Sequence, residues 1–293
     1  MSNPVIGFIG LGVMGEPMCR NLRVRGRHRV LATDLDAAPL ARLAEHGIEA
    51  GGGIGAVVRA SDIVFASLPS GRVLEGVVRG ADGVLANLRA GQIFVDLGTS
   101  PVALTRALAA EFAAKGVHYL DAPVARTRQA AEAGTLSVMV GGDPETFREV
   151  EPLIACFASD ITHCGVVGNG QVTKILNNMV LFETVAALSE AYAIAKRSGL
   201  DPALLFDTLA KGSADSFALR NHGMKAIVPQ VFPERAFSVE YAQKDLAYAL
   251  ELAADTGVDA EGARRVDRLF NRAIEAGLGD QYHPVVSRLL DGD

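Results

Sequence analysis

A glycine-rich turn near the amino terminus constrains this chain more than any other feature. Residues 5–9 (VIGFI) are a short apolar run that predicts a buried strand, and a helical pattern follows up to Arg25. The turn between them matches the pattern G-x-G-x-x-G, in the hexapeptide Gly10-Leu11-Gly12-Val13-Met14-Gly15. A strand, such a turn and a helix in this order are typical of a unit that binds a dinucleotide, because the glycines allow the main chain to approach a pyrophosphate at the helix amino terminus.

Apolar runs that alternate with helical segments continue to about residue 165. We predict further strands at 29–33, 62–67, 92–96, 118–124, 137–142 and 161–165, and helices at 39–46, 73–79 and 101–115. Strands that alternate with helices favour right-handed crossovers and a mostly parallel, doubly wound α/β sheet. The last two predicted strands lack a full helix between them, so we expect part of the sheet edge to be antiparallel.

The pattern changes after Gly170. Residues 171–197 keep a helical periodicity with no Pro or Gly inside, which predicts one helix about 40 Å long. Further helices are predicted at 202–211, 215–226, 238–256 and 259–276. We therefore expect two domains: an α/β domain at 1–165, and an all-helical domain at 166–293 that is built on the long interdomain helix.

Composition limits the partners of the chain. Its 293 residues carry a formal net charge of -6, which argues against a nucleic-acid partner. We find no apolar run of about 20 residues and no basic segment before the first apolar run, so we expect neither a membrane span nor a secretory signal. Cys19, Cys156 and Cys164 form no metal or redox spacing. We expect a cytoplasmic protein with no metal site.

The cofactor choice rests on the end of the second strand. Asp34 follows Gly15 by about 20 residues, where an acidic side chain accepts hydrogen bonds from the adenosine ribose and repels a 2′-phosphate. The next residue is Leu35 rather than an arginine, so we predict NAD in preference to NADP. The alternative is that Asp34 only caps its turn. Loops after two later strands are expected cofactor contacts by position, at Leu68, Pro69 and Thr99.

Three further segments carry polar residues in unusual contexts. They read DAPV followed by AGTLSVMVGG at 121–142, GNGQVTKILNN at 168–178, and KDL at 244–246. Together with GFIGLGVMGEPMCRNL at 7–22, they resemble in order and spacing the β-hydroxyacid dehydrogenase family, which includes 3-hydroxyisobutyrate dehydrogenase and tartronate semialdehyde reductase. The resemblance covers nearly the whole chain. It implies a Rossmann domain, a helical domain like the carboxyl-terminal part of 6-phosphogluconate dehydrogenase, and a homodimer or homotetramer.

The resemblance also implies a reaction and its residues. The family transfers a hydride between nicotinamide and the alcohol or aldehyde carbon of a small anionic hydroxy acid. Lys174 matches its catalytic lysine and Asn178 its substrate-orienting asparagine. Residues four apart share a helix face, so both can reach one substrate oxygen. The remaining matches are Lys244 and Phe237 near the cofactor, and Ser213, Phe237 and Asp245 around the substrate. Asn177 either faces the substrate or supports the helix.

A lysine base requires a pKa below its ordinary value of about 10.4. We expect burial, the nicotinamide charge and Arg126 to lower the pKa of Lys174. Without the surrounding motif, the ordinary interpretation of this residue would be a solvated helix lysine.

The chain departs from the family where the substrate acid is held. Most members read Ser-Gly-Gly after Asp-x-Pro-Val, whereas this chain reads Ala125-Arg126-Thr127. Arginine presents a rigid fork of donors suited to oxyanions, so we expect Arg126 and Thr127 to bind the acidic group. The variant resembles the sulfolactaldehyde reductase branch, which makes a sulfonate the alternative to a carboxylate. The alternative is that Arg126 has no role in substrate binding and instead faces solvent or pairs with Glu132.

Two rival functions stay open. An imine reductase on the same scaffold generally lacks the lysine at position 174, and a non-catalytic NAD-binding module would not need it. 6-Phosphogluconate dehydrogenase itself has a much longer helical domain.

Overall fold

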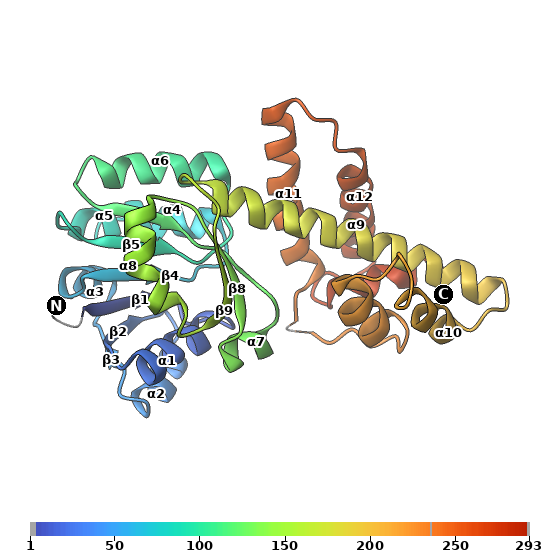
Figure 1. Ribbon diagram of the computed structural model, residues 1–293, viewed down its shortest axis with the longest axis horizontal. Helices are drawn as coiled ribbons and strands as arrows, with labels where there is room; N and C mark the ends of the chain where they lie inside the picture. The colour runs from blue at the N-terminus through green and yellow to red at the C-terminus, as the bar shows by residue number, and fades with distance from the viewer. Residues whose placement is uncertain (1–3, 235, 292–293) are drawn as a thin grey trace. The chain divides into compact units, whose positions relative to one another are not determined.

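The computed structural model describes residues 4–234 and 236–291. The chain packs as two compact units, residues 1–174 and residues 175–293 (Figure 1). The α/β unit extends past the predicted boundary at 165 and takes in the first part of the long helix α9 (Asn169–Arg197).

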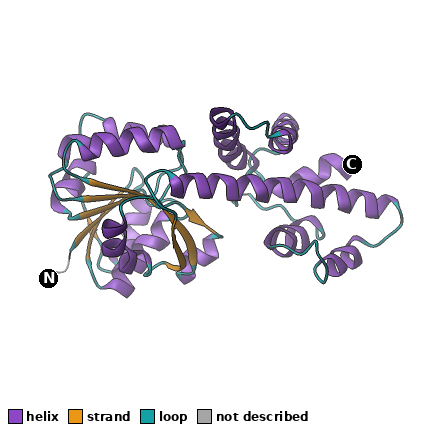
Figure 2. Cartoon of the chain, turned by 45° about the horizontal axis from the view of Figure 1, so that its top comes forward, coloured by secondary structure: helices purple, strands orange, loops and turns teal. Residues whose placement is uncertain are grey.

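The α/β unit contains a six-stranded sheet in the order β3-β2-β1-β4-β5-β6. Figure 2 shows the strands of this unit in orange and its helices in purple. Every neighbouring pair in this sheet is parallel. The chain order reverses between β1 and β4, where open α/β sheets bind their ligands at the carboxyl ends of the strands. The strands are β1 (Val5–Ile9), β2 (Arg29–Thr33), β3 (Glu49–Ala50), β4 (Ile63–Ala66), β5 (Ile93–Asp96) and β6 (His118–Asp121).

Helices cover both faces of this sheet because its strands are apolar on both sides. One core contains Phe8 and Phe65 packed against α1 and α8, and the other contains Val64 and Phe94 packed against α3, α4 and α6. The predicted doubly wound α/β architecture is therefore confirmed. The helices are α1 (Gly15–Gly26), α2 (Ala37–Ala44), α3 (Ile54–Ala60), α4 (Gly71–Arg79), α5 (Val84–Asn87), α6 (Val102–Ala113), α7 (Arg128–Ala133) and α8 (Pro144–Ile154).

The predicted edge of the sheet needs a correction. The run at 118–124 divides into β6 and β7 (Val124–Ala125), and β7 joins a separate sheet in the order β7-β8-β9. β8 (Leu136–Val140) and β9 (Ala158–His163) are parallel, while the antiparallel pair is β7 with β8. Helix α8, which we did not predict, supplies the crossover. The sequence Asp143-Pro144 is typical of a helix start, and in the structure Asp143 accepts hydrogen bonds from the first-turn main chain.

Other elements missing from the prediction are short. β3 has two residues and α5 has four. The seven residues of α3 follow three consecutive glycines and give too few turns for a clear periodicity.

The helical unit is built around the rest of α9. Its core gathers apolar side chains of α9, α11 and α12, among them Phe182, Leu246 and Phe270. The predicted helix at 215–226 is a π-helix, η1 (Leu219–Ile227). Within residues 175–234 and 236–291 we find only isolated β-bridges and no strand. The other helices are α10 (Pro202–Leu209), α11 (Val239–Thr256), α12 (Glu261–Glu275), η2 (His283–Ser287) and α13 (Arg288–Asp291). No described helix has the length and apolar character of a membrane span.

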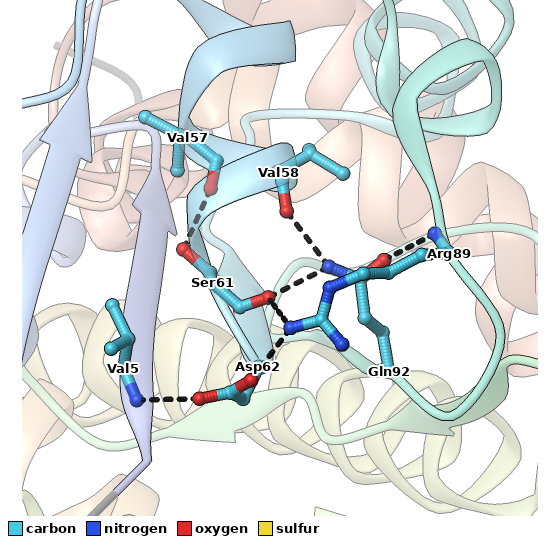
Figure 3. Close-up of polar contacts among 7 residues, drawn as sticks. All are labelled: Val5, Val57, Val58, Ser61, Asp62, Arg89 and Gln92. Carbon is cyan, nitrogen blue, oxygen red and sulfur yellow. Dashed lines mark hydrogen bonds and ion pairs between the residues drawn. The ribbon is translucent and has the colours of Figure 1, made fainter.

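The amino ends of the parallel strands are closed by a polar cluster (Figure 3). Gln92 is fully buried, and its amide donates to the carbonyls of Val58 and Ser61 at 2.8 and 2.7 Å. Its own oxygen accepts the main-chain N–H of Arg89 at 2.6 Å. Asp62 accepts the N–H of Val5 at 3.0 Å and pairs with the Arg89 guanidinium at 2.6 Å. The donors and acceptors at this end thus satisfy one another.

Candidate active site

The glycine-rich turn has three glycines with three different requirements. Gly10 has φ of +91°, and a Cβ there would lie 2.3 Å from the Ser67 carbonyl oxygen. A Cβ on Gly15 would lie 2.1 Å from the Gly10 carbonyl oxygen. Around Gly12, by contrast, no atom lies within 4 Å of such a Cβ. Gly10 and Gly15 therefore shape the turn, and Gly12 leaves its main chain open to a ligand.

Helix α1 begins behind this turn without a side-chain cap at Met14, and the dipole of a helix amino terminus favours an anion there. In its first turn, the Glu16 N–H donates to the Gly12 carbonyl at 3.1 Å. The Asp34 carboxylate accepts the main-chain N–H groups of Leu11 and Asp36. Asp34 thus braces the glycine turn at the end of β2. The geometry fits a dinucleotide. Arg42 is the first cationic residue after Asp34 in the sequence, and it makes a bidentate pair with Glu16 at 2.6 and 2.8 Å.

The loops predicted to contact the cofactor follow the carboxyl ends of β4 and β5. Leu68 and Pro69 lie directly before Ser70, which caps α4. Thr99 is buried in the loop between β5 and α6. Because β1, β4 and β5 are adjacent and parallel, these loops and the glycine turn share one edge of the sheet.

Helix α9 starts at that same edge, on the carboxylate of Asp121 at the end of β6. Asp121 accepts the main-chain N–H groups of Gly168 and Gln171, both at 2.8 Å. A Cβ on Gly170 would lie 2.5 Å from the Met139 carbonyl oxygen, so only glycine permits this approach. Lys174 lies one turn later and is 8% exposed, which excludes an ordinary solvated lysine.

In the helical unit, Asn178 of α9 is held by α11. Its amide donates to Asp245 at 2.7 Å, and both side chains are buried. The Lys244 ammonium lies 3.0 Å from the other Asp245 oxygen. The same ammonium lies 4.1 Å from the ring centre of Tyr241, a cation–π contact that the sequence did not indicate. A lysine, a carboxylate and an amide therefore form one network.

Of the other predicted residues of the helical unit, Asn177 and Phe237 contact members of this network. Asn177 is exposed and donates to the Asn178 oxygen at 3.1 Å. Phe237 packs against Tyr241, with ring centres 5.5 Å apart. Ser213 is exposed in the turn after α10.

Arg126 is bound within the α/β unit. Its guanidinium donates to the Thr135 carbonyl at 2.7 Å and pairs with Asp160 at 2.8 Å. The alternative pairing with Glu132 is wrong, because Arg128 takes that carboxylate. Arg126 also has φ of +86°, a conformation that favours glycine, which most of the family carry here. To bind a substrate, the guanidinium would have to leave or share Asp160.

The neighbours of Arg126 support local secondary structure. Ala125 is buried in β7, and Thr127 caps α7 by accepting the N–H of Ala130.

Two residues at the carboxyl edge were missed. Asp96 and Gln171 are fully buried, 3.5 Å apart at their side chains. Burial raises the pKa of Asp96 to about 7, and burial also raises the pKa of Asp121. An aspartate that ends a predicted buried strand was a readable signal for Asp96. Gln171 had none, because glutamine is usually a solvated helix residue.

Comparisons with known proteins agree with this geometry. Residues 5–165 match the family model of the NAD-binding domain of 6-phosphogluconate dehydrogenase. Residues 168–290 match a second family model, which is described as "NAD-binding of NADP-dependent 3-hydroxyisobutyrate dehydrogenase".

Among similar proteins, 2-(hydroxymethyl)glutarate dehydrogenase of Eubacterium barkeri is 36% identical, over 98% of this chain and 94% of its own. The 2-hydroxy-3-oxopropionate reductase of Escherichia coli is 33% identical, over 98% and 97%. A solved 3-hydroxyisobutyrate dehydrogenase of Mycobacterium tuberculosis with L-serine superposes with a TM-score of 0.89, at 31% identity over 98% and 99% of the chains. The chain belongs to the β-hydroxyacid dehydrogenase family and is an NAD(P)-dependent oxidoreductase.

Proposed function

We propose that the chain moves a hydride between NAD and the alcohol or aldehyde carbon of a small 3-hydroxy acid, with Lys174 as the acid–base group. The observation that carries this proposal is the burial of Lys174 one helical turn before the buried Asn178. The bound nicotinamide supplies the hydride acceptor in oxidation and the hydride donor in reduction.

The residues of the chain handle the proton. In oxidation, neutral Lys174 takes the proton from the substrate hydroxyl while the hydride leaves the carbon that bears this hydroxyl. In reduction, the Lys174 ammonium returns a proton to the carbonyl oxygen. Asn178 donates a second N–H to this oxygen, and Asp245 holds the Asn178 amide in place. The proton transfer requires a Lys174 pKa below the ordinary lysine value of about 10.4.

We propose NAD in preference to NADP. The Asp34 carboxylate beside the glycine turn supports this choice, because it would repel a 2′-phosphate. The commitment of Arg42 to Glu16 supports it further. Rates with the two cofactors, in the wild type and in Asp34→Ala, test it: the variant should lose preference for NAD, and an unchanged ratio would refute the role of Asp34.

For the acidic group of the substrate, we propose a carboxylate held by the segment Ala125-Arg126-Thr127. The substrates named for the similar proteins are carboxylates, and Arg126 is bound to Asp160 rather than free. A sulfonate is the second candidate, because a guanidinium stands where most of the family carry glycine.

The test is NADH formation with 3-hydroxyisobutyrate, glycerate, 2-(hydroxymethyl)glutarate and dihydroxypropanesulfonate. We expect turnover with a carboxylate, and Lys174→Met should lower kcat by about 10²–10⁴-fold. Lys115→Met, on an exposed residue after α6, is the matched control and should keep wild-type kcat. Full turnover in Lys174→Met would refute the acid–base role, and turnover with the sulfonate alone would replace the carboxylate. If no substrate reacts although NAD binds tightly, the non-catalytic module would be favoured.

A further inference from the structure

We propose that Gln171 is a positioning residue that ties the loop carrying Thr99 to the helix carrying Lys174. This inference rests on the proposed function, because it assigns Thr99 to the cofactor side and Lys174 to proton transfer. Gln171 itself touches neither reactant in this scheme, since its side-chain oxygen and nitrogen are both bonded within the α/β unit.

One amide clamps the main chain on both sides of Thr99. The Gln171 side-chain oxygen accepts the N–H of Ser100 at 3.0 Å. Its side-chain nitrogen donates to the Gly98 carbonyl at 2.9 Å and lies 3.5 Å from Asp96. A glutamine that only filled space would not need a donor and an acceptor in this arrangement. The conformation of the Thr99 loop is therefore linked to the position of Gln171.

The main chain of Gln171 is anchored separately. Its N–H donates to Asp121 at 2.8 Å, and the preceding Gly170 packs against the Met139 and Asp121 carbonyls. The first turn of α9 is thus bound to the ends of β5, β6 and β8. Lys174 follows Gln171 by three residues, nearly one turn, so the direction of its side chain depends on the rotation of this turn.

Such a clamp should act on the hydride step. A misplacement of about 1 Å between reacting groups can cost on the order of 10²-fold in rate. Loosening the Thr99 loop relative to α9 should lower kcat and leave the KM for the hydroxy acid nearly unchanged.

The fold supplies a matched control at the opposite end of the same sheet. Gln92 is also fully buried, and its side chain also makes two donor contacts and one acceptor contact, to Val58, Ser61 and Arg89 (Figure 3). Gln171→Met and Gln92→Met each remove three polar contacts and keep the side-chain length. We expect similar losses of stability in urea unfolding from the two variants.

The kinetics should separate them. With NAD and the best substrate of the panel, Gln171→Met should lower kcat by about 10–100-fold. It should also raise the primary isotope effect with substrate deuterated at the reacting carbon. Gln92→Met should keep wild-type kcat and isotope effect. Gln171→Asn keeps a neutral amide donor and acceptor on a side chain one methylene shorter, so its kcat should lie between those of the wild type and Gln171→Met. It guards against a Gln171→Met variant that fails to fold.

Equal kcat values in Gln171→Met and Gln92→Met, or a fall in kcat with no rise in the isotope effect, would overturn the positioning role. Full turnover in Lys174→Met would overturn the acid–base assignment instead, so the two proposals fail by different results.

Discussion

The two ends of the parallel sheet place their acidic residues in opposite surroundings. At the amino ends, the acidic residue Asp62 meets an arginine and a main-chain donor, which together lower its pKa. At the carboxyl ends, the donors to Asp96 among the described residues are all neutral and include Gly98, Ser100 and Tyr119. Burial raises its pKa to about 7, and the nearby Asp121 adds to the rise.

This difference indicates which end of the sheet costs the fold free energy. A carboxylate buried without a cation is costly, whereas a half-exposed one beside arginine is not. The costly end is the one that carries the glycine turn, the Thr99 loop and the start of α9. Strongly perturbed ionisable groups tend to gather where a fold supports a site. The amino end carries none of the proposed site residues, and its polar groups bond to one another.

Removal of the Asp121 side chain should give the largest change in stability and is the most direct test of the difference between the two ends. Asp121→Ala leaves the buried N–H groups of Gly168 and Gln171 without their acceptor. We expect a loss of about 2–6 kcal/mol in the free energy of unfolding, since each of the two orphaned groups costs about 1–3 kcal/mol. Urea unfolding measures it. If Asp62→Ala were as harmful, the contrast between the two ends would not hold.

The pH dependence of Asp96 gives an intermediate effect. Its pKa in the folded protein is about 7, above the ordinary value of 3.8, so the folded state holds the proton longer. Its contribution to stability is therefore fully present below pH 3.8 and is lost as the pH rises through about 7. The total loss is a few kcal/mol at most, at about 1.4 kcal/mol per pKa unit.

Asp96→Asn should remove that fall, as seen in urea unfolding of variant and wild type between pH 4 and pH 8. Parallel stability curves for the two proteins would contradict a raised Asp96 pKa.

Asp62 should give the smallest effect, with the opposite sign. Its pKa is lowered by the Val5 N–H first and Arg89 second, so its contribution is present above 3.8 and is lost as the pH falls through the folded pKa. The side chain is 49% exposed, which limits the effect to less than about 1 kcal/mol. Asp62→Asn should therefore flatten the acid limb of the stability curve only slightly. A larger change than in Asp96→Asn would reverse our ranking of the two ends.

Elements whose sequences carry a clear local pattern were predictable. The strand, turn and helix around Gly10 and the 29-residue helix α9 follow from patterns a few residues long. The small sheet was not predicted correctly, because the run at 118–124 looks continuous although its two halves pair with different strands. Pairing partners far along the chain decide that division.

The sequence alone determined the α/β and helical classes, the glycine turn, and the spacing of Lys174 and Asn178, because these depend on helix and strand periods. Only the tertiary structure decided that Gln171 bridges to residues 71 and 73 positions away, and that Arg126 pairs with Asp160 instead of Glu132. Contacts between distant segments depend on how the layers pack, and a local pattern carries no record of that packing.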